Sequence, residues 1–325
     1  MKQKNIVLAS IILIVVLSPA VAGDGVFSGM VRDYATVRFD QADMPVHEIT
    51  ADLRYDYYGD LGKLTLHPVA YSTGNEGVYF DLEEAYFDFY LPSADLRVGK
   101  QKVIWGEAEG AFITDLVSPR DMRSFILADF TEIRKAVPAI KIDYYAGDYT
   151  LEGIWVTHFI PTTLPSQDSI WKQTPSLAPA LASATIEEAT MPDASLENSE
   201  VFLSLGRFGN TISWKVNGGY VFTDEPLVTG ITPPPPSPTI SQGYEQYGFV
   251  GGSFNTTIGS VVLRGEAALA LEKPFNTVDT SAVPPAFSTE YHNQVQTLVG
   301  LDWNMLGAQW STQYLLTYTH DHNDT

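Results

Sequence analysis

Apolar and polar residues alternate along many segments of this chain. Between residues 47 and 58, Leu53 and Tyr55 fall on one parity, whereas Asp52 and Arg54 fall on the other. A period of two residues is typical of strands with one apolar and one polar face. The pattern predicts about thirteen strands, near residues 26–39, 47–58, 63–71, 80–91, 95–105, 138–146, 149–158, 199–208, 211–223, 244–255, 260–271, 292–303 and 307–319.

The length of these segments favours a membrane protein. Most run for 9 to 13 residues, whereas soluble strands usually have ~5–6 residues and tilted membrane-spanning strands need ~9–11. Aromatic residues lie near several strand ends, where they would form the interfacial girdles of a membrane barrel. These residues are Tyr57, Tyr58, Tyr90, Trp155, Tyr220, Phe222, Trp303 and Tyr318.

The predicted connectors alternate in length. Tight turns fall at 59–62, 92–94, 146–148, 208–210, 256–259 and 304–307. Long polar links fall at 106–137, 159–198, 224–243 and 272–291. Short turns at one end and long loops at the other are the pattern of an outer-membrane barrel, and only a closed barrel satisfies the backbone of strands in hydrocarbon. We therefore predict an all-β fold, an antiparallel up-and-down transmembrane β-barrel, rather than a soluble all-β domain.

The number of predicted strands is odd, whereas single-chain bacterial barrels have an even number. The last segment ends in a polar run, residues 319–325, which resembles the start of another long loop. We therefore expect an incomplete, C-terminally truncated barrel. The alternative is that the strand count is wrong by one.

The N-terminus predicts a secretory signal peptide. Lys2 and Lys4 precede an apolar run at residues 6–17, and Ala20 and Ala22 mark a cleavage site of small residues. We expect residues 1–22 to be the signal peptide and residues 23–325 to form the barrel. This organisation places the protein in the outer membrane of a Gram-negative bacterium.

Composition excludes other classes of protein. A net charge of -20 lacks the cationic excess with which nucleic-acid-binding proteins neutralise phosphates. The chain has no cysteine, so disulfides do not stabilise it. Beyond the signal segment there is no run of ~18 apolar residues that would predict a transmembrane helix.

Cations gather in one part of the chain. Eight of the 19 Lys and Arg residues lie between Arg97 and Lys141. In the segment 95–105 the apolar parity changes near Gly99, where a bulge would turn the cations inward. The following link, 106–137, is both charged and apolar, which predicts that it folds into the lumen and packs there.

Charges on an inward link would narrow a pore and select solutes by charge and shape. The alternative is that they form ion pairs that brace the barrel wall, because buried charges must be paired. The candidate constriction residues are Arg97, Lys100, Lys102, Glu107, Glu109, Arg120, Asp121, Arg123, Glu132, Arg134 and Lys135.

This stretch also resembles a known family. Residues 98–123 read VGKQKVIWGEAEGAFITDLVSPRDMR, and residues 131–140 read TEIRKAVPAI. Together they resemble a motif of an uncharacterised porin-like outer-membrane β-barrel family that carries a domain-of-unknown-function label and is distantly similar to alginate-export barrels. The matching residues are Gly99, Gln101, Trp105, Gly106, Glu107, Pro119, Asp121, Glu132, Arg134 and Pro138.

Two positions depart from the family pattern: Lys100 stands where Arg is usual, and Ser118 where Asn is usual. The resemblance implies a large monomeric barrel that works beside an efflux system for hydrophobic compounds. It implies no enzyme activity.

The residues predict no catalytic or metal site. The chain has six histidines and no Gly-x-Ser-x-Gly elbow, which argues against a serine hydrolase. Glu107 and Glu109 could resemble the two catalytic carboxylates of a glycosidase. Two glutamates two residues apart are better interpreted as acids on one strand edge. His320 and His322 are best interpreted as part of a solvated loop. We expect no cofactor.

We predict a porin-like outer-membrane channel for small solutes or hydrophobic compounds, with a charged constriction that sets its selectivity. The alternative is a structural or adhesive outer-membrane barrel whose acidic outer loops bind a partner. In either case the expected surroundings are outer-membrane lipid and the barrel-assembly machinery, without nucleic acid. The oligomeric state stays open.

Overall fold

The computed structural model describes the chain as a large β-sheet protein. The described residues are 8–22, 24–39, 43–73, 77–107, 110–123, 132–165, 169, 171, 184–232, 238–279 and 286–320. No helix in these residues is long and apolar enough to cross a membrane.

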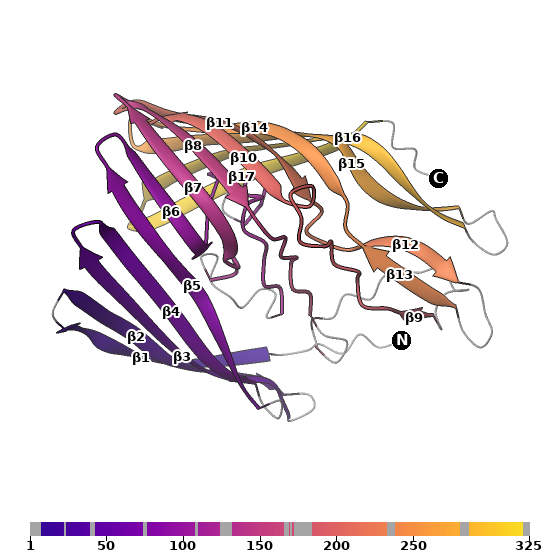
Figure 1. Ribbon diagram of the computed structural model, residues 1–325, viewed down its shortest axis with the longest axis horizontal. Coiled ribbons are helices and arrows are strands. Elements are labelled where there is room, and N and C mark those ends of the chain that lie inside the picture. Colours follow the sequence, from indigo (N-terminus) through magenta and orange to yellow (C-terminus); the bar gives the residue numbers. More distant parts are fainter. Residues whose placement is uncertain are drawn as a thin grey trace.

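Fourteen strands form one antiparallel sheet, ordered along the sheet as they are along the chain. Their sheet is strongly curved (Figure 1). They are β1 (Leu8–Ala22), β2 (Gly25–Arg38), β3 (Asp43–Gly59), β4 (Gly62–Thr73), β5 (Val78–Leu91), β6 (Ala94–Gln101), β7 (Val137–Ala146), β8 (Tyr149–Val156), β10 (Glu200–Arg207), β11 (Ile212–Phe222), β14 (Gln246–Ile258), β15 (Val261–Asp279), β16 (Ala286–Met305) and β17 (Ala308–Thr319).

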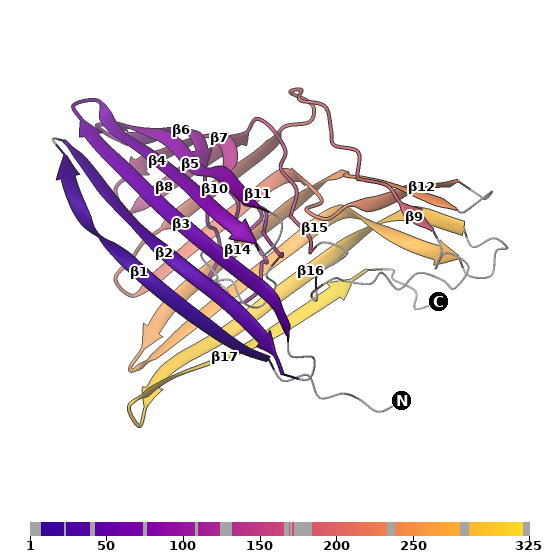
Figure 2. The ribbon, with the colours of Figure 1, turned by 90° about the horizontal axis from the view of Figure 1, so that it is seen from below.

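The antiparallel all-β prediction is confirmed, and each of the thirteen predicted strands is present. The fourteenth, β1, lies in the segment predicted as a signal peptide and pairs with β2. Cleavage of that segment stays a prediction. In the described chain the edge strands β1 and β17 do not pair with each other, so the sheet is not closed. Figure 1 shows β1–β4 and β14–β17 on opposite sides of the interior, and the view from below shows β1–β4 side by side (Figure 2).

Tight turns join the strands at one end of the sheet, as predicted. At the β16–β17 turn, Leu306 and Gly307 both have positive φ, 57° and 77°, which matches the twist of a two-residue hairpin. Gly62 at the start of β4 has a φ of 147°, and a Cβ there would lie 1.7 Å from the Asp88 carbonyl oxygen. Only glycine therefore fits that close approach of two backbones.

Three predicted long links contain regular structure, and the 159–198 link contributes the short strand β9 (Thr185–Ile186). The 272–291 link is largely strand, because β15 continues to Asp279 and β16 begins at Ala286. The polar residues of this segment predicted a loop, but two strands that pair with each other in a hairpin do not require apolar residues. The 224–243 link contains β12 (Leu227–Thr232) and β13 (Thr239–Gly243), which form a small sheet with β9.

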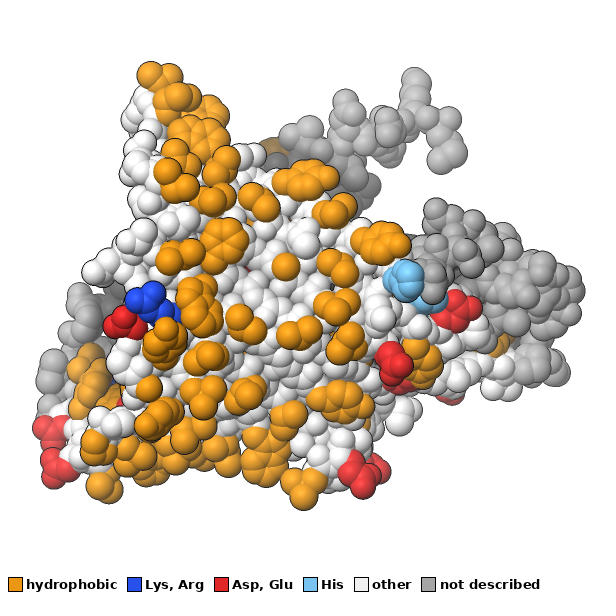
Figure 3. Space-filling model, turned by 90° about the horizontal axis from the view of Figure 1, so that it is seen from above, with side chains coloured by type: hydrophobic (Ala, Val, Ile, Leu, Met, Phe, Trp, Pro, Cys, Tyr) orange, Lys and Arg blue, Asp and Glu red, His pale blue; other side chains and the backbone are white. Residues whose placement is uncertain are grey.

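The two faces of the large sheet differ as the alternation predicts. Along β10 the exposed fractions are 50% for Val201, 3% for Phe202, 60% for Leu203 and 3% for Ser204. The outer face is covered with apolar side chains, and the charged ones lie toward its margins (Figure 3). Water does not favour this arrangement, whereas lipid does.

Most of the predicted girdle residues face outward, but Phe222 does not. Its side chain is 5% exposed and packs against Phe159, with ring centroids 4.7 Å apart. The prediction for Phe222 was wrong because residues that follow β8 cover the end of β11. Strand parity alone does not reveal such a cover.

The main hydrophobic core lies inside the curve of the sheet. Val103, Trp105 and Val117 pack against inward side chains of the wall. These wall residues are Val137, Ala139, Ile154, Val156, Phe202, Val221, Tyr247 and Phe249. Each fully buried large apolar side chain contributes ~1.5–3 kcal/mol, so the apolar residues between β6 and β7 hold that segment against the wall.

Candidate functional site

The segment between β6 and β7 crosses the concave side of the sheet. It leaves the wall after Gln101 and returns at Val137. We call residues 102–136 the link; the structure describes 102–107, 110–123 and 132–136 of it. The predicted strand 95–105 was therefore too long at its C-terminal end. Ile113, Thr114 and Val117 of the link are almost fully buried.

Strand β6 carries cations that meet acids of β5. Arg97 Nε lies 2.6 Å from Asp88 Oδ1, and its guanidinium lies 4.1 Å from the centre of the Tyr86 ring. Lys100 Nζ lies 3.1 Å from Asp81 Oδ1. These contacts tie the cations to the neighbouring strand.

Lys102, the first residue of the link, is tied to the same strand. Its Nζ lies 2.8 Å from Glu83 Oε2, and its backbone N–H donates to Glu84 Oε1 at 3.0 Å. Glu83 and Glu84 both lie within 4 Å of the His67 ring. Two consecutive glutamates therefore reach the interior together.

The inward position of both glutamates shows where the register of the strand pairing shifts. The register shift lies between β4 and β5, at His67 and Pro68. The pairing of β6 with β5 and β7 is continuous through Gly99, although Gly99 has a φ of 135°. The prediction of a register shift near Gly99 was therefore wrong. The irregularity that turns Glu83 and Glu84 inward lies in the pairing of β4 with β5.

The first half of the family-like motif anchors the link to the wall. Gln101 is fully buried, and its Nε2 donates to the Ala139 carbonyl oxygen at 3.0 Å. The Trp105 indole N–H donates to Glu152 on β8, and its backbone N–H donates to Asp115 Oδ1 at 2.9 Å. This half of the motif therefore fixes the point at which the chain enters the interior.

Glu266 on β15 holds the far side of the link. Its carboxylate accepts backbone N–H groups of Glu107, at 2.8 Å, and Thr114, at 2.7 Å. Gly106 has a φ of 86°, and a Cβ there would lie 2.6 Å from Glu266 Oε1. The Glu107 carbonyl accepts from Arg264 Nη1 at 3.1 Å. Glu107 therefore contributes through its backbone N–H and carbonyl groups. Glu109 lies outside the described residues.

A buried ion pair stands at the centre of the link. Arg134 Nη2 and Asp115 Oδ2 are 2.5 Å apart, with side chains 7% and 3% exposed. Burial raises the pKa of Asp115, and the charge of Arg134 acts in the opposite direction. Removal of either partner would take a counter-charge away from a site with little water.

The two halves of the motif meet. Arg120 and Arg134 form an antiparallel bridge, and the Lys135 backbone N–H donates to the Pro119 carbonyl oxygen at 2.7 Å. The Asp121 N–H donates to the Ile133 carbonyl oxygen at 2.6 Å. Residues 119–121 and 133–135 therefore form a clamp within the link.

The clamp reaches the loop that follows β11. Arg120 Nη2 lies 3.1 Å from Asp224 Oδ2, and its guanidinium lies 4.8 Å from the centre of the Phe112 ring. Burial raises the pKa of Asp224, and Arg120 opposes that shift. Arg123 pairs with Asp121 at 2.5 Å.

Lys135 of the clamp and the adjacent Glu132 contact other parts of the chain. Glu132 Oε2 lies 2.6 Å from Arg32 Nη1 on β2. Lys135 Nζ donates to neutral oxygens, the Pro161 carbonyl at 3.0 Å and Thr163 Oγ1 at 2.7 Å, and burial lowers its pKa. Pro138, the last motif residue, accepts the Thr157 backbone N–H at 3.0 Å.

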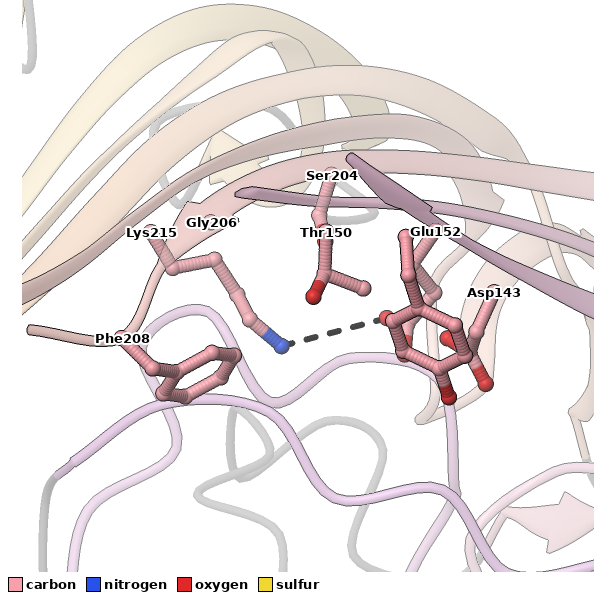
Figure 4. Close-up of a pocket in the computed structure, with 8 residues that line it drawn as sticks. Asp143, Thr150, Glu152, Ser204, Gly206, Phe208 and Lys215 are labelled. Atoms are coloured by element: carbon pink, nitrogen blue, oxygen red, sulfur yellow. Dashed lines mark ion pairs between the residues drawn. The ribbon is translucent and has the colours of Figure 1, made fainter. Parts of the chain in front are cut away.

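Two cavities lie on the concave side. One, of about 310 Å³, lies between the link and the strands β14–β16, with Phe112, Leu116 and Arg120 on the link side. The other, of about 210 Å³, lies near the tight turns and is lined by Glu152 and Lys215 among others (Figure 4). Among the described residues, no three His, Cys, Asp or Glu side chains are placed to hold a metal ion.

Comparison with known proteins places the chain in a family. A family model described as "Protein of unknown function (DUF1302)" matches residues 70–325. The chain belongs to the DUF1302 family. A search of curated proteins found no match.

Solved structures with a similar fold are outer-membrane proteins of Vibrio cholerae. OmpT with loop L8 deleted is 9% identical, with a TM-score of 0.46, and the match covers 96% of this chain and 81% of that one. In-vitro folded OmpT in its trimer form is 10% identical, with a TM-score of 0.39, and the match covers 96% of this chain and 89% of that one. The likeness concerns the fold alone.

In this DUF1302 chain most of the candidate constriction cations form ion pairs. Six of the candidate cations, Arg97, Lys100, Lys102, Arg120, Arg123 and Arg134, have a carboxylate partner. Sequence reasoning missed the distant acids that hold the link. Asp224 pairs with Arg120, whereas Glu152 and Glu266 accept hydrogen bonds from other residues of the link. The available signal was an acid at an inward position of a strand, but nothing in the sequence shows which segment it meets.

Proposed function

We propose that this DUF1302 protein is a porin-like outer-membrane channel for small solutes, in which the passage runs beside the link. The observation that carries the proposal is the cavity of about 310 Å³ between the link and β14–β16. Arg120 and Asp224 line it as an ion pair, so a solute that passes there would meet fixed charges of both signs.

The two faces of the sheet support a membrane location. The outer face carries apolar side chains such as Leu203 and Val216, whereas Asn217 and Glu266 are buried on the inner face. Apolar residues toward lipid and polar residues toward the lumen are the arrangement of outer-membrane barrels. The outer membrane is therefore the proposed location.

In the alternative function the protein is a barrel without a passage for solutes. The link is braced to β2, β8 and β15 through Arg32, Glu152 and Glu266, and a braced link is also what a plug requires. Under this alternative the barrel is structural or adhesive, and its outer loops bind a partner.

Conductance of the full-length protein in planar lipid bilayers separates the two functions. We expect steady single-channel current, with altered conductance or ion selectivity in Arg120→Gln. Arg207→Gln is the matched control, because Arg207 pairs with the exposed Asp148 outside the link and its loss should leave the current unchanged. Silent membranes with correctly folded protein would refute the channel and favour the structural barrel.

A further inference from the structure

A β-bulge places one lysine in the interior of the sheet. The pairing of β15 with β16 shifts between Ala270 and Lys273, so that residues 271 and 272 oppose Asn293 alone. Glu272 has a φ of 51°, one of two positive values at non-glycine positions in the described chain. A regular strand would turn Glu272 inward after Ala270. The bulge turns Lys273 inward instead, and such re-aimed side chains are often functional.

Lys273 lies among aromatic and amide groups. Its Nζ donates to Gln294 Oε1 at 3.2 Å and lies 5.7 Å and 5.5 Å from the ring centres of Tyr247 and Phe275. It forms no ion pair with any carboxylate that the structure describes. In the part of the chain that the structure describes, the other interior lysines pair with acids or donate to several oxygens, so Lys273 has capacity for a further anion.

Lys273 lines the cavity of about 310 Å³ beside the link. Phe112, Leu116 and Phe249 form an apolar part of its wall, and Gln296 adds an amide. At ~30 Å³ per water-sized group, this space holds roughly ten non-hydrogen atoms. A ligand of that size would have one polar end and an apolar body.

The other charges of the cavity favour an anion over a cation. Asp224 is already paired with Arg120, and Glu225 is exposed to water. The Arg120 Nε–H is buried without an acceptor among the described atoms. Among the described residues, the cavity is therefore lined by Arg120, whose Nε–H lacks an acceptor, and by a lysine without a carboxylate partner, whereas its acid Asp224 is already paired.

We infer that this cavity binds small monocarboxylates with an apolar body, with the carboxylate at Lys273 and the apolar part against Phe112, Leu116 and Phe249. The inference rests on the proposed channel function, for which it names the class of solute. A carboxylate gains a charge-assisted hydrogen bond from the ammonium group, and the aromatic wall removes the apolar body from water.

Binding is measured by titration calorimetry on the full chain, folded in detergent, with benzoate and octanoate as probes. Benzamide and 1-octanol are the neutral analogues, and octylamine is the cationic one. We expect the carboxylates to bind at least about tenfold more tightly than these analogues, because a hydrogen bond to a charged group is lost with each of them. Equal affinity for the analogues, or preference for octylamine, would overturn the inference.

Variants test the role of Lys273 itself. We expect Lys273→Gln to weaken carboxylate binding about tenfold and Lys273→Arg to restore most of it. Lys63→Gln is the matched control, because Lys63 pairs with Asp56 at 3.1 Å and lies on β4, which is not a neighbour of β15 in the sheet, so its loss should not affect binding. Unchanged affinity in folded Lys273→Gln would refute the site. Steady current without carboxylate binding would leave the channel standing and reject only this inference.

Discussion

Charged side chains of the interior differ in how their charge is compensated. Arg134 and Asp115 are buried together as an ion pair, whereas Lys135, the next residue, donates to neutral oxygens. Ion pairs hold a charge in place without a change of protonation, but a buried lysine with neutral partners loses its proton more easily. Adjacent residues of one motif are therefore expected to respond differently to pH.

The lowered pKa of Lys135 predicts that the free energy of unfolding depends on pH. Burial lowers the pKa of Lys135 from 10.5 in the folded protein. Between that lowered pKa and 10.5, the unfolded chain binds a proton that the folded chain does not, so the free energy of unfolding rises with pH in this window. The stability that this group contributes is lost as pH falls through the folded pKa.

Urea unfolding in lipid vesicles at a series of alkaline pH values checks this expectation. Lys135→Met should show a smaller increase of stability with pH than the wild-type protein across the same range. Parallel curves for the two proteins would show that Lys135 titrates as it does in the unfolded chain.

Gly106 is expected to be irreplaceable for a reason beyond its backbone conformation. Gly106 and Gly147 both have positive φ, 86° and 63°, but a Cβ at Gly106 would lie 2.6 Å from Glu266 whereas one at Gly147 meets nothing within 4 Å. Both alanine substitutions cost ~1–3 kcal/mol of backbone strain. Gly106→Ala should cost ~1.5–3 kcal/mol more, because it displaces the charged acceptor of the link.

Thermal denaturation in detergent, followed by the change of gel mobility on unfolding, measures both variants. The Gly147→Ala protein should melt somewhat below the wild-type temperature because of its backbone strain, and the Gly106→Ala protein clearly below the Gly147→Ala protein. Equal melting temperatures would mean that Glu266 moves aside without cost.

At the scale of the elements, the sequence predicted what depends on neighbouring residues. The two-residue period identified every large strand from β2 to β17, and on β3 it assigned the exposed Leu53 and the half-buried Asp52 to opposite faces. Glycine-containing turns such as 306–307 marked the hairpins. These features are local, because side-chain direction in a strand follows from parity alone.

The path of the link was beyond such local reasoning. Thr114 meets Glu266 across a separation of 152 residues, and Arg32 meets Glu132 across 100 residues. Nothing in the residues around Thr114 selects an acid on β15 over another inward acid. The bulge at β4–β5 escaped prediction for the same reason, since it is a property of two strands rather than of one.

The link should depend on its central ion pair. Asp115→Asn removes the partner of a buried Arg134, which costs ~3–5 kcal/mol. Asp148→Asn removes the partner of Arg207, but that pair is exposed, with side chains 65% and 37% accessible, so the change should be below ~1 kcal/mol. The measurement is urea unfolding of both variants in vesicles.

The same two variants test whether the central ion pair holds the link in place. If the link loosens in Asp115→Asn, limited proteolysis of the folded protein should cut between β6 and β7, while Asp148→Asn stays resistant there. Resistance in both variants, together with equal stability, would mean that the apolar contacts of Val117 and Trp105 hold the link without the ion pair.

At the scale of the whole molecule, the outer surface and the interior impose different conditions on the chain. The outer face is apolar, whereas the interior holds the charged link on the concave side of the sheet. The sheet that meets both conditions includes β1, which lies in the segment predicted to be a signal peptide. Removal of residues 1–22 would make β2 the first strand of the sheet.

We therefore expect the exported protein to begin near Gly23 and to be extracted only with detergent. The apolar run at residues 6–17 and the small residues Ala20 and Ala22 fit a signal that is removed on export. Intact-mass measurement of protein purified from the outer-membrane fraction checks the N-terminus, with Ala20→Arg and Ala22→Arg as a double variant that should block cleavage. A mass that retains residues 1–22 in the wild-type protein would show instead that β1 is a permanent strand of the sheet, paired with β2 in the membrane.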